Sequence, residues 1–237
     1  MSTGRVVVVT GASRGIGRAC AEWFAERGDR VAALSSSGTA VDVAELSMTC
    51  DVADSASVDA AFTEIESVLG PAEVLVANAG ITVDQLALRM TDEAWDRVLR
   101  VNLSGAFFCA RRALRRMVRA HGGRIVFVSS VGAFLGVPGQ ANYAASKAGL
   151  VGVARSLARE VASRGVTVNV VAPGLVDTDM LGATGEDRTA QLSAMVPLGR
   201  VAAPAEVASL VGFVASGDAG YVTGAVLPID GGLSMGL

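Results

Sequence analysis

The sequence predicts an α/β fold, in which one doubly wound, seven-stranded parallel sheet carries helices on both faces. Short apolar runs alternate with segments of helical periodicity along the whole chain, as expected for parallel strands joined by helical crossovers. The first apolar run holds four consecutive valines, from Val6 to Val9, and such a run indicates a strand buried on both faces. Of the 237 residues, 51% are hydrophobic and only 5% aromatic, and 28 are glycine. This composition fits aliphatic strands and tight turns in one domain spanning residues 1–237.

The elements follow one another in a regular order. A helix over 15–27 follows the valine strand, because Ile16, Ala19, Trp23 and Phe24 fall on one side at helical spacing. We predict strands near residues 5–10, 30–35, 46–50, 73–77, 123–129, 166–172 and 225–229, and helices near 15–27, 55–69, 91–119, 142–163 and 204–216. The link 36–45 is too short for a full crossover helix, so at most one helical turn is expected there. The other crossovers are expected to be right-handed.

A glycine-rich turn joins the first strand to the first helix. The motif is Thr-Gly-Ala-Ser-Arg-Gly-Ile-Gly, with glycines at positions 11, 15 and 17. Glycine lets the backbone approach a pyrophosphate closely, and a helix N-terminus offers free N–H groups and the positive end of a dipole. The motif therefore predicts a dinucleotide site. The alternative is a glycine-rich turn that binds no ligand.

A second motif lies in the segment 129–147, where Tyr143 and Lys147 are four residues apart. On a helix, this spacing brings both side chains to one face. A free tyrosine keeps its proton at neutral pH, and a nearby ammonium favours the phenolate, so the tyrosine becomes a usable acid or base. A serine hydroxyl could polarise a carbonyl beside it. Taken alone, the pair could also be an exposed aromatic residue beside a solvated lysine.

Together these motifs resemble the short-chain dehydrogenase/reductase family, and the resemblance covers the whole chain. Asn78-Ala79-Gly80 follows the predicted strand 73–77 and is similar to the family's Asn-Ala-Gly motif, although Ala77 stands where a further Asn is usual. Asn102 matches the family's active-site asparagine, Pro173-Gly174 its Pro-Gly motif, and Asp51 its adenine-contacting aspartate. The runs 139–149, 158–165, 167–174 and 177–180 most closely resemble the family's 3-oxoacyl-acyl-carrier-protein reductases of bacterial fatty acid synthesis.

The resemblance implies a Rossmann-type fold and hydride transfer from NADPH to a ketone. In that mechanism Ser130 holds the substrate carbonyl, Tyr143 donates a proton to the developing alkoxide, Lys147 lowers the pKa of Tyr143 and binds the nicotinamide ribose, and Asn102 holds a water. Ser130 is preferred to Ser129 because its thirteen-residue spacing to Tyr143 matches the family. Asn102 also interrupts a helical segment, where asparagine tends to bond locally and disturb the helix.

The resemblance also implies the cofactor contacts. They are Gly11, Ser13, Arg14, Gly15, Ile16, Gly17, Ser35, Ser36, Asp51, Val52, Asn78, Ala79, Gly80, Tyr143, Lys147, Pro173, Gly174, Val176 and Thr178. An acidic residue after the second strand would accept a hydrogen bond from the ribose of NAD and repel a phosphate. Serines 35 to 37 stand there instead, and Arg14 could bind the extra phosphate of NADPH. We therefore expect NADPH to be preferred; the alternative is a polar turn that accepts either cofactor.

Other features exclude several classes of protein. The net charge of −3 argues against a nucleic-acid-binding chain. Cys20, Cys50 and Cys109 lack metal-ligand spacing and lie in apolar segments, so buried free thiols are expected. His121 is the only histidine, which excludes a histidine cluster, and no metal site is expected. No run is long enough to span a bilayer, and no signal peptide precedes the first strand, so a cytoplasmic protein is expected.

The arginine-rich run 111–119 is either a solvated helix face or a surface for an acidic carrier protein. The resemblance implies a basic carrier-docking patch near the mouth of the active site, to which Arg164 and Arg119 would contribute, with His121 at the place of another arginine. It also implies a mobile substrate lid over 181–195 and a homotetramer. Three alternatives stay open: a reductase of acyl-CoA, polyketide or other ketone or alcohol substrates, a non-catalytic dinucleotide-sensing protein, and a methyltransferase on a similar sheet.

Overall fold

The computed structural model describes residues 4–182 and 186–235 and contains one seven-stranded sheet, all of whose pairings are parallel. The strand order is β3-β2-β1-β4-β5-β6-β7. The strands are β1 (Val6–Thr10), β2 (Arg30–Ser35), β3 (Leu46–Thr49), β4 (Val74–Ala77), β5 (Gly123–Val128), β6 (Val166–Pro173) and β7 (Val226–Ile229). The predicted fold class is confirmed, and each strand lies within about a residue of its predicted bounds. The interpretation of 1–237 as one domain stays a prediction.

The four valines of β1 are divided between two cores. Val6 and Val8 belong to the hydrophobic cluster on one face of the sheet, and Val7 and Val9 to the cluster on the other face. All four are at most 4% exposed. Because successive side chains of a strand point to opposite faces, an unbroken apolar run is what a strand between two helical layers requires.

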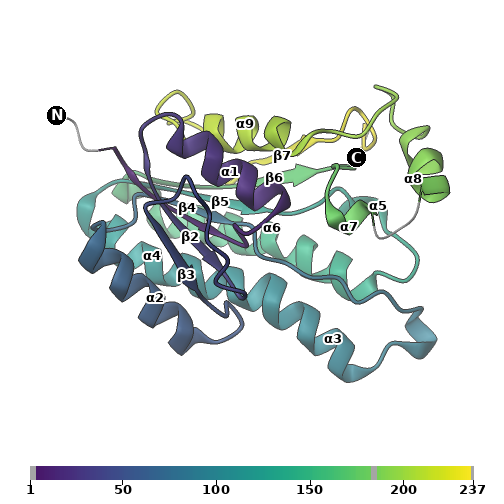
Figure 1. The fold of residues 1–237 in the computed structure, drawn as a ribbon, viewed down its shortest axis with the longest axis horizontal. Helices are drawn as coiled ribbons and strands as arrows, with labels where there is room; N and C mark the ends of the chain where they lie inside the picture. The colour runs from purple at the N-terminus through teal and green to yellow at the C-terminus, as the bar shows by residue number, and fades with distance from the viewer. Residues whose placement is uncertain (1–3, 183–185, 236–237) are drawn as a thin grey trace.

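Five longer helices form the two outer layers (Figure 1). One face carries α1 (Gly15–Ala25) and α9 (Pro204–Val214); the other carries α2 (Ser55–Val68), α4 (Ala106–Ala120) and α6 (Ala141–Val161). The helices α1 and α9 approach each other closely at Gly212, where a Cβ would overlap the ring of Trp23. Glycine at this position therefore sets the spacing of that layer.

The predicted helix over 91–119 is present, and it contains a π-helical turn that the sequence pattern did not predict. The segment is divided into α3 (Asp92–Leu99), a π-helical turn η2 (Arg100–Gly105) and α4. The hydroxyl of Thr91 caps α3 by accepting a hydrogen bond from the amide of Ala94 at 3.2 Å. Asn102 lies inside the π-helical turn, a feature that is frequent at functional sites.

Several short elements gather where the strands end. They are α5 (Gly132–Leu135), α7 (Asp179–Gly182) and α8 (Glu186–Ser193). Two 3₁₀ turns, η1 (Ala87–Arg89) and η3 (Ala162–Arg164), lie elsewhere in the described chain. Figure 1 shows α5, α7 and α8 on the right, at the carboxyl end of the sheet. The helix α8 falls within the segment 181–195 expected to be a lid, of which residues 183–185 lie outside the described residues. The link 36–45 holds no helix among the described residues, as the prediction of at most one turn allows.

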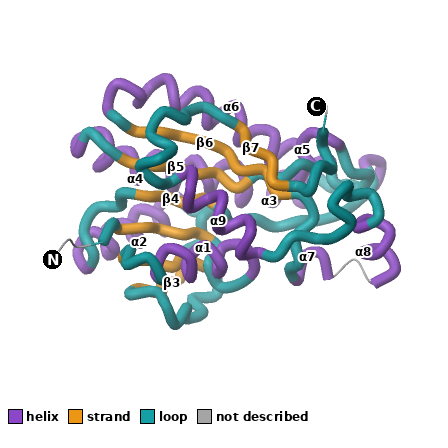
Figure 2. Tube along the Cα trace, turned by 90° about the horizontal axis from the view of Figure 1, so that it is seen from above, coloured by secondary structure: helices purple, strands orange, loops and turns teal. Residues whose placement is uncertain are grey.

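The order of strands along the chain reverses at β1. From β1 the chain runs outward to β2 and β3, and it then returns to β4 on the other side of β1. Figure 2 shows β3 on one side of the sheet and β5 and β6 on the other. In open parallel sheets, ligands bind in the crevice outside the carboxyl ends of the strands at such a reversal. The fold therefore places the candidate site beyond the ends of β1 and β4.

Candidate active site

The glycine turn after β1 requires glycine on steric grounds. Gly11 has φ of +65°, and a Cβ there would lie 2.8 Å from the Cα of Ala79. A Cβ on Gly17 would overlap the carbonyl oxygen of Gly11. The amide of Ala12 donates to the carbonyl of Leu34 at 3.1 Å, which holds the turn against the end of β2. The backbone itself therefore forms the floor of the predicted dinucleotide site.

Asn78 fastens the reversal point from the other side. Its side-chain amide donates to the carbonyls of Thr10 and Gly11, at 3.1 and 3.2 Å. The hydroxyl of Thr10 in turn accepts from the amides of Asn78 and Ala79, at 3.0 and 3.1 Å. Asn78 and Ala79 thus hold β4 against the glycine turn, which gives the predicted Asn-Ala-Gly motif a structural task.

The start of α1 suits an anion. Arg14 is its N-cap, and in the described chain its side chain makes no capping hydrogen bond. The first intrahelical bond runs from the amide of Arg18 to the carbonyl of Arg14, at 3.2 Å. The amides of Gly15, Ile16 and Gly17 therefore have no intrahelical acceptor, and together with the helix dipole they favour a phosphate group. These residues fit a nicotinamide dinucleotide, with Ser13 at the edge of the same turn.

Asn102 is 1% exposed and binds across the fold. Its side-chain oxygen accepts from the amide of Ile81 at 2.8 Å, and its amide donates to the carbonyl of Ile81 and to the hydroxyl of Ser146, both at 3.0 Å. The interruption of the helix expected at Asn102 is present, but its cause differs from the expected local bonding. The partners of this side chain are distant in sequence: the main-chain groups of Ile81, which follows β4, and the hydroxyl of Ser146 on α6.

Lys147 is the buried cation of the site. It is 4% exposed, and its ammonium donates to the carbonyl of Val128, at the end of β5, at 2.8 Å. Burial lowers the pKa of Lys147 to about 8. A Cβ on Gly80 would lie 3.3 Å from both the Lys147 nitrogen and the Asn102 side-chain oxygen, so these two groups converge on one glycine.

Tyr143 lies one helical turn before Lys147 on α6, and the lysine nitrogen is 5.7 Å from the centre of its ring. Burial raises the pKa of Tyr143, a hydrogen bond with Ser130 lowers it, and the charge of Asp84 raises it further. The net direction is upward, so the expected lowering of the pKa of Tyr143 by Lys147 is not found in this structure. The reason is that desolvation of the phenol outweighs the favourable contacts of the phenolate.

The two serines after β5 have different surroundings. The hydroxyl of Ser129 is buried and donates to the carbonyl of Lys147 at 2.8 Å. Ser130 is half-buried, accepts from the amide of Gly132 at 3.1 Å and reaches Tyr143. The choice of Ser130 over Ser129 as the residue that faces a substrate stays a prediction.

The end of β6 closes the site. The amide of Gly174 donates to the carbonyl of Ile229 at 2.9 Å, and a Cβ on Gly174 would lie 2.8 Å from the Cα of Asp230. The amide of Val131 donates to the carbonyl of Pro173 at 2.9 Å. Val176 is buried, and the methyl group of Thr178 lies 3.2 Å from the position of a Cβ on Gly15. Thr178 therefore lies over the glycine turn.

Four predicted cofactor contacts lie at the end of β2 and after β3. Ser36 is exposed, whereas Ser35 is 7% exposed, with its hydroxyl 3.2 Å from that of Ser37. Asp51 is exposed and accepts from the amide of Ala53 at 2.9 Å. The side chain of Val52 is buried, with a methyl carbon 2.9 Å from where a Cβ on Gly105 would lie.

Two polar residues of the site were not among the predicted ones. Ser146 binds Asn102 and donates to the carbonyl of Tyr143 at 2.7 Å. Asn142 is fully buried and donates to the carbonyls of Val83 and Ala94, at 3.0 and 3.3 Å. Asn142 and Ser146 are four residues apart on α6, so the helical spacing of these polar residues was a signal that could have found them.

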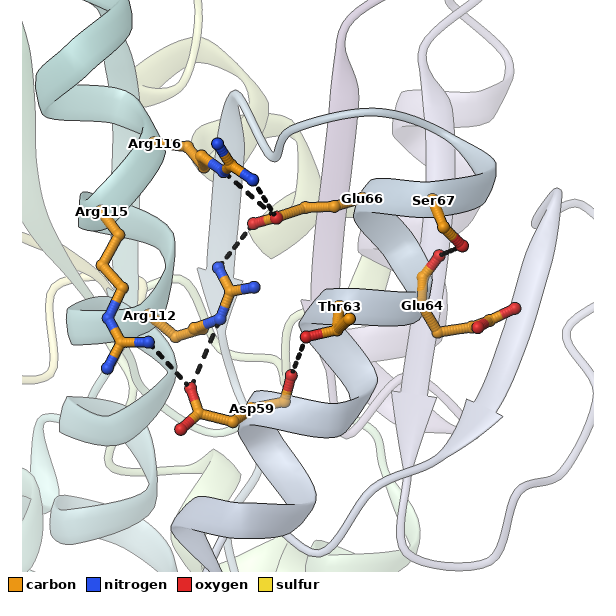
Figure 3. A network of polar contacts seen from close by, with 8 residues as sticks. All are labelled: Asp59, Thr63, Glu64, Glu66, Ser67, Arg112, Arg115 and Arg116. Carbon is orange, nitrogen blue, oxygen red and sulfur yellow. Dashed lines mark hydrogen bonds and ion pairs between the residues drawn. The ribbon is translucent and has the colours of Figure 1, made fainter.

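Most of the arginine-rich run is bound within the chain (Figure 3). Arg112 is 8% exposed, is paired with Glu66 at 2.5 Å, and lies 3.4 Å from Asp59. Arg116 contacts the other oxygen of Glu66 at 2.9 Å, and Arg115 lies 3.4 Å from Asp59. The hydrogen bond with Arg112 holds the pKa of Glu66 at about 2. This part of the run therefore joins α4 to α2.

Arg164 and His121 lie at the amino end of the strands, and Ser130 lies at their carboxyl end. Arg164 precedes β6 and contacts the ring of His121 at 3.2 Å, and His121 precedes β5. The six residues of β5 span roughly 20 Å, which separates the amino end from the carboxyl end that holds Ser130. The expectation that the basic patch lies near the active-site mouth is therefore wrong within one chain.

Across 4–182 and 186–235, no three or more His, Cys, Asp or Glu side chains group as metal ligands would. In the same part of the chain, no helix combines the length and the apolar character needed to cross a membrane.

The chain is similar to known proteins over almost its whole length. A family model described as enoyl-(acyl carrier protein) reductase matches residues 11–234. The 3-oxoacyl-acyl-carrier-protein reductase MabA of Mycobacterium tuberculosis is 49% identical over 232 residues, which cover 98% of this chain and 94% of that protein. The 3-oxoacyl-acyl-carrier-protein reductase FabG of Escherichia coli is 44% identical over 239 residues, which cover 98% of each chain.

Proposed function

The chain belongs to the short-chain dehydrogenase/reductase family, and from that membership we propose that it reduces 3-oxoacyl thioesters on acyl carrier protein to 3-hydroxyacyl thioesters, with NADPH, in fatty acid biosynthesis. The observation that carries the proposal is the convergence of Ser130, Tyr143 and Lys147 at the carboxyl end of β5, in a chain 44–49% identical to two reductases of this name.

A nicotinamide dinucleotide, when bound, supplies the hydride that the reduction requires. The hydroxyl of Ser130 donates a hydrogen bond to the substrate carbonyl and stabilises the negative charge that develops on its oxygen. Tyr143 then gives its phenolic proton to that oxygen. The raised pKa of Tyr143 keeps the proton on the phenol at neutral pH, as a proton donor requires.

Lys147 serves both the cofactor and the proton transfer. Its ammonium donates to the carbonyl of Val128, and an ammonium has three N–H donors. The remaining donors are suited to the ribose hydroxyls. With a pKa of about 8, Lys147 is mostly charged at neutral pH and stabilises the phenolate that remains when Tyr143 has given up its proton. Asn102 fixes the loop after β4 through Ile81 and so positions Gly80 beside Lys147.

The preference for NADPH rests on the residues after β2. Ser35 and Ser36 stand where a carboxylate would select NADH, and the exposed guanidinium of Arg14 is available to a phosphate from the adjacent turn. The other proposed cofactor contacts are the glycine turn, Asp51, the backbone of Val52, Asn78 to Gly80, Pro173, Gly174, Val176 and Thr178.

The surroundings of Ser130 suit an acyl chain. Phe134, Leu135 and Val137 follow it within one short segment and are 42%, 43% and 41% exposed. A Cβ on Gly132 would lie 3.3 Å from the Ser130 hydroxyl and 3.7 Å from a methyl group of Val137, so this apolar group adjoins the catalytic serine. Exposed apolar side chains that gather beside a site are characteristic of a ligand-binding surface.

The carrier-docking hypothesis calls for more than one subunit. Arg164 and Arg119 lie at the amino end of the strands, and Tyr143 of the same chain lies at the carboxyl end. They therefore reach an active-site mouth only if it belongs to a neighbouring chain. We propose a homotetramer in which Arg119 and Arg164 of one subunit lie beside the active site of another. The exposed side chains of Phe213 and Tyr221, at 47% and 104% exposure, are apolar surface available to such contacts.

The test is NADPH oxidation by the purified protein, with acetoacetyl-acyl carrier protein and acetoacetyl-CoA compared at equal concentration. We expect much faster turnover of the carrier-linked substrate. Equal or faster turnover of the CoA ester would assign the protein to free thioesters instead. Turnover of neither substrate, with cofactor bound, would overturn the proposal.

A further inference from the structure

Arg14 of the glycine turn forms an ion pair with Asp179, which begins α7 on the far side of the site. The distance between the arginine nitrogen and the carboxylate oxygen is 3.1 Å, and the side chains are 76% and 72% exposed. The residue before Asp179 packs on the same turn, because the methyl group of Thr178 lies 3.2 Å from a Cβ built on Gly15. The pair thus joins two segments 165 residues apart at the rim of the dinucleotide site.

The side chain of Arg14 has a second possible partner, a phosphate near the end of β2. The hydrogen bond from Ala12 to Leu34 holds the turn against the end of β2, where Ser35 and Ser36 carry no charge. Arg14 is also the N-cap of α1, so its side chain starts beside the amides suited to a phosphate. One guanidinium therefore stands between a carboxylate on α7 and the position of a phosphate on the adenosine ribose.

The ion pair with Asp179 is weak enough to be exchanged. A single contact between two largely exposed groups is worth little in water, because solvent screens both charges. A phosphate ester offers more charge and binds the fork of an arginine through two hydrogen bonds. The carboxylate and the phosphate cannot both hold the same face of the guanidinium.

We propose that Asp179 is a positioning residue for cofactor choice: it holds Arg14 in the free protein and competes with the 2′-phosphate of NADPH for it. The inference rests on the proposed use of NADPH. Loss of the carboxylate leaves Arg14 free for the phosphate, so NADPH binding tightens. NADH has no such phosphate and does not draw on Arg14, so its binding stays the same.

The test measures cofactor binding without substrate, by calorimetric titration of NADPH and NADH at one ionic strength. For Asp179→Asn we expect the Kd of NADPH to fall about two- to fivefold, the range that an exposed ion pair can supply, and the Kd of NADH to stay within error. Glu22→Gln is the matched control. It removes the carboxylate of another exposed pair, Arg18 with Glu22 at 2.9 Å on α1, with the same change in net charge.

The double variant Arg14→Ala with Asp179→Asn separates competition from a general field effect. If Asp179 acts through Arg14, its removal has no further effect on NADPH binding once Arg14 is alanine. Equal tightening for both cofactors, tightening by Glu22→Gln to the same extent, or tightening that persists without Arg14 would each overturn the inference. Failure of the proposed function is a separate result, since the wild-type protein would then bind neither cofactor or reduce no thioester.

Discussion

The side-chain amide of Asn102 donates a hydrogen bond to the hydroxyl of Ser146, 3.0 Å away on the helix that carries Tyr143 and Lys147. The contact joins the π-helical turn to α6, and the hydroxyl of Ser146 also donates a hydrogen bond to the carbonyl of Tyr143. Both residues are at most 1% exposed. This buried chain of hydrogen bonds fixes the position of α6 relative to the loop after β4.

Replacement of Ser146 by alanine should therefore weaken both the fold and the site. The amide of Asn102 loses one of its two acceptors in a place without water, so we expect a loss of about 1–2 kcal/mol in the free energy of unfolding, measured by urea denaturation. Ser209→Ala is the control, because that hydroxyl binds only within its own helix, to Ala205, on the surface. A loss no greater than in the control would contradict the structural task of Ser146.

Tyr143→Phe should abolish reduction and spare cofactor binding. Removal of a general acid costs a factor of about 10²–10⁴ in kcat, and the ring itself still fills its place on α6. Rates with the carrier-linked substrate and the Kd of NADPH give the two readouts. Near-normal turnover in this variant would refute the assignment of Tyr143, and loss of NADPH binding would assign it to the cofactor site instead.

Lys147 should make stability depend on pH in a defined window. Its pKa is lowered from 10.5 to about 8 in the folded protein, so between these values the unfolded chain binds more protons and the free energy of unfolding rises with pH. The rise attributable to Lys147 is at most about 3 kcal/mol. Below pH 8 both states hold the proton, and the contribution is constant.

The matching variant is Lys147→Met, which fills the same volume without a charge. We expect the wild-type free energy of unfolding to gain on that of the variant as pH rises from 8 towards 9.5. Burial raises the pKa of Cys20 to about 12, which opposes this trend equally in both proteins, so the difference isolates Lys147. Parallel profiles for the two proteins would contradict the lowered pKa.

Glu66 should stabilise the contact between α2 and α4, and do so only above acid pH. Its side chain is 14% exposed between Arg112 and Arg116, and hydrogen bonding to Arg112 lowers its pKa to about 2 (Figure 3). A depressed pKa gives stability that is complete above about pH 4.5 and lost as pH falls towards 2. Glu66→Gln should therefore destabilise the protein at pH 7 and flatten its acid limb.

The expected cost of Glu66→Gln is about 1–3 kcal/mol, because Arg112 stays buried with a weaker partner. Thermal or urea unfolding between pH 7 and pH 3 provides the measurement. Glu64→Gln, an exposed carboxylate on the same helix, is the control. If both variants lost the same free energy of unfolding with the same acid profile, the stabilising role of Glu66 between α2 and α4 would be contradicted.

The sequence by itself determined the local features. The valine run, the glycine turn and the Tyr143–Lys147 spacing each depend on neighbours along the chain, so composition and periodicity were enough to predict strands, the phosphate-suited turn and one shared helix face. The family resemblance then supplied the reaction. The disturbance of the helix at Asn102 is likewise a prediction from a residue type within one local segment.

Only the tertiary structure decided what depends on residues far apart in sequence. The partners of Asn102 are the main-chain groups of Ile81 and the hydroxyl of Ser146, and burial sets the pKa of Lys147 and reverses the expected direction for Tyr143. The pairing of Arg112 with Glu66 turned a basic run into an interhelical contact. Arg164 lies at the amino end of the parallel strands and Tyr143 at their carboxyl end, so the length of the strands separates them. Sequence motifs alone do not reveal at which end of the sheet a loop lies, because that depends on the direction of the strands in the folded structure.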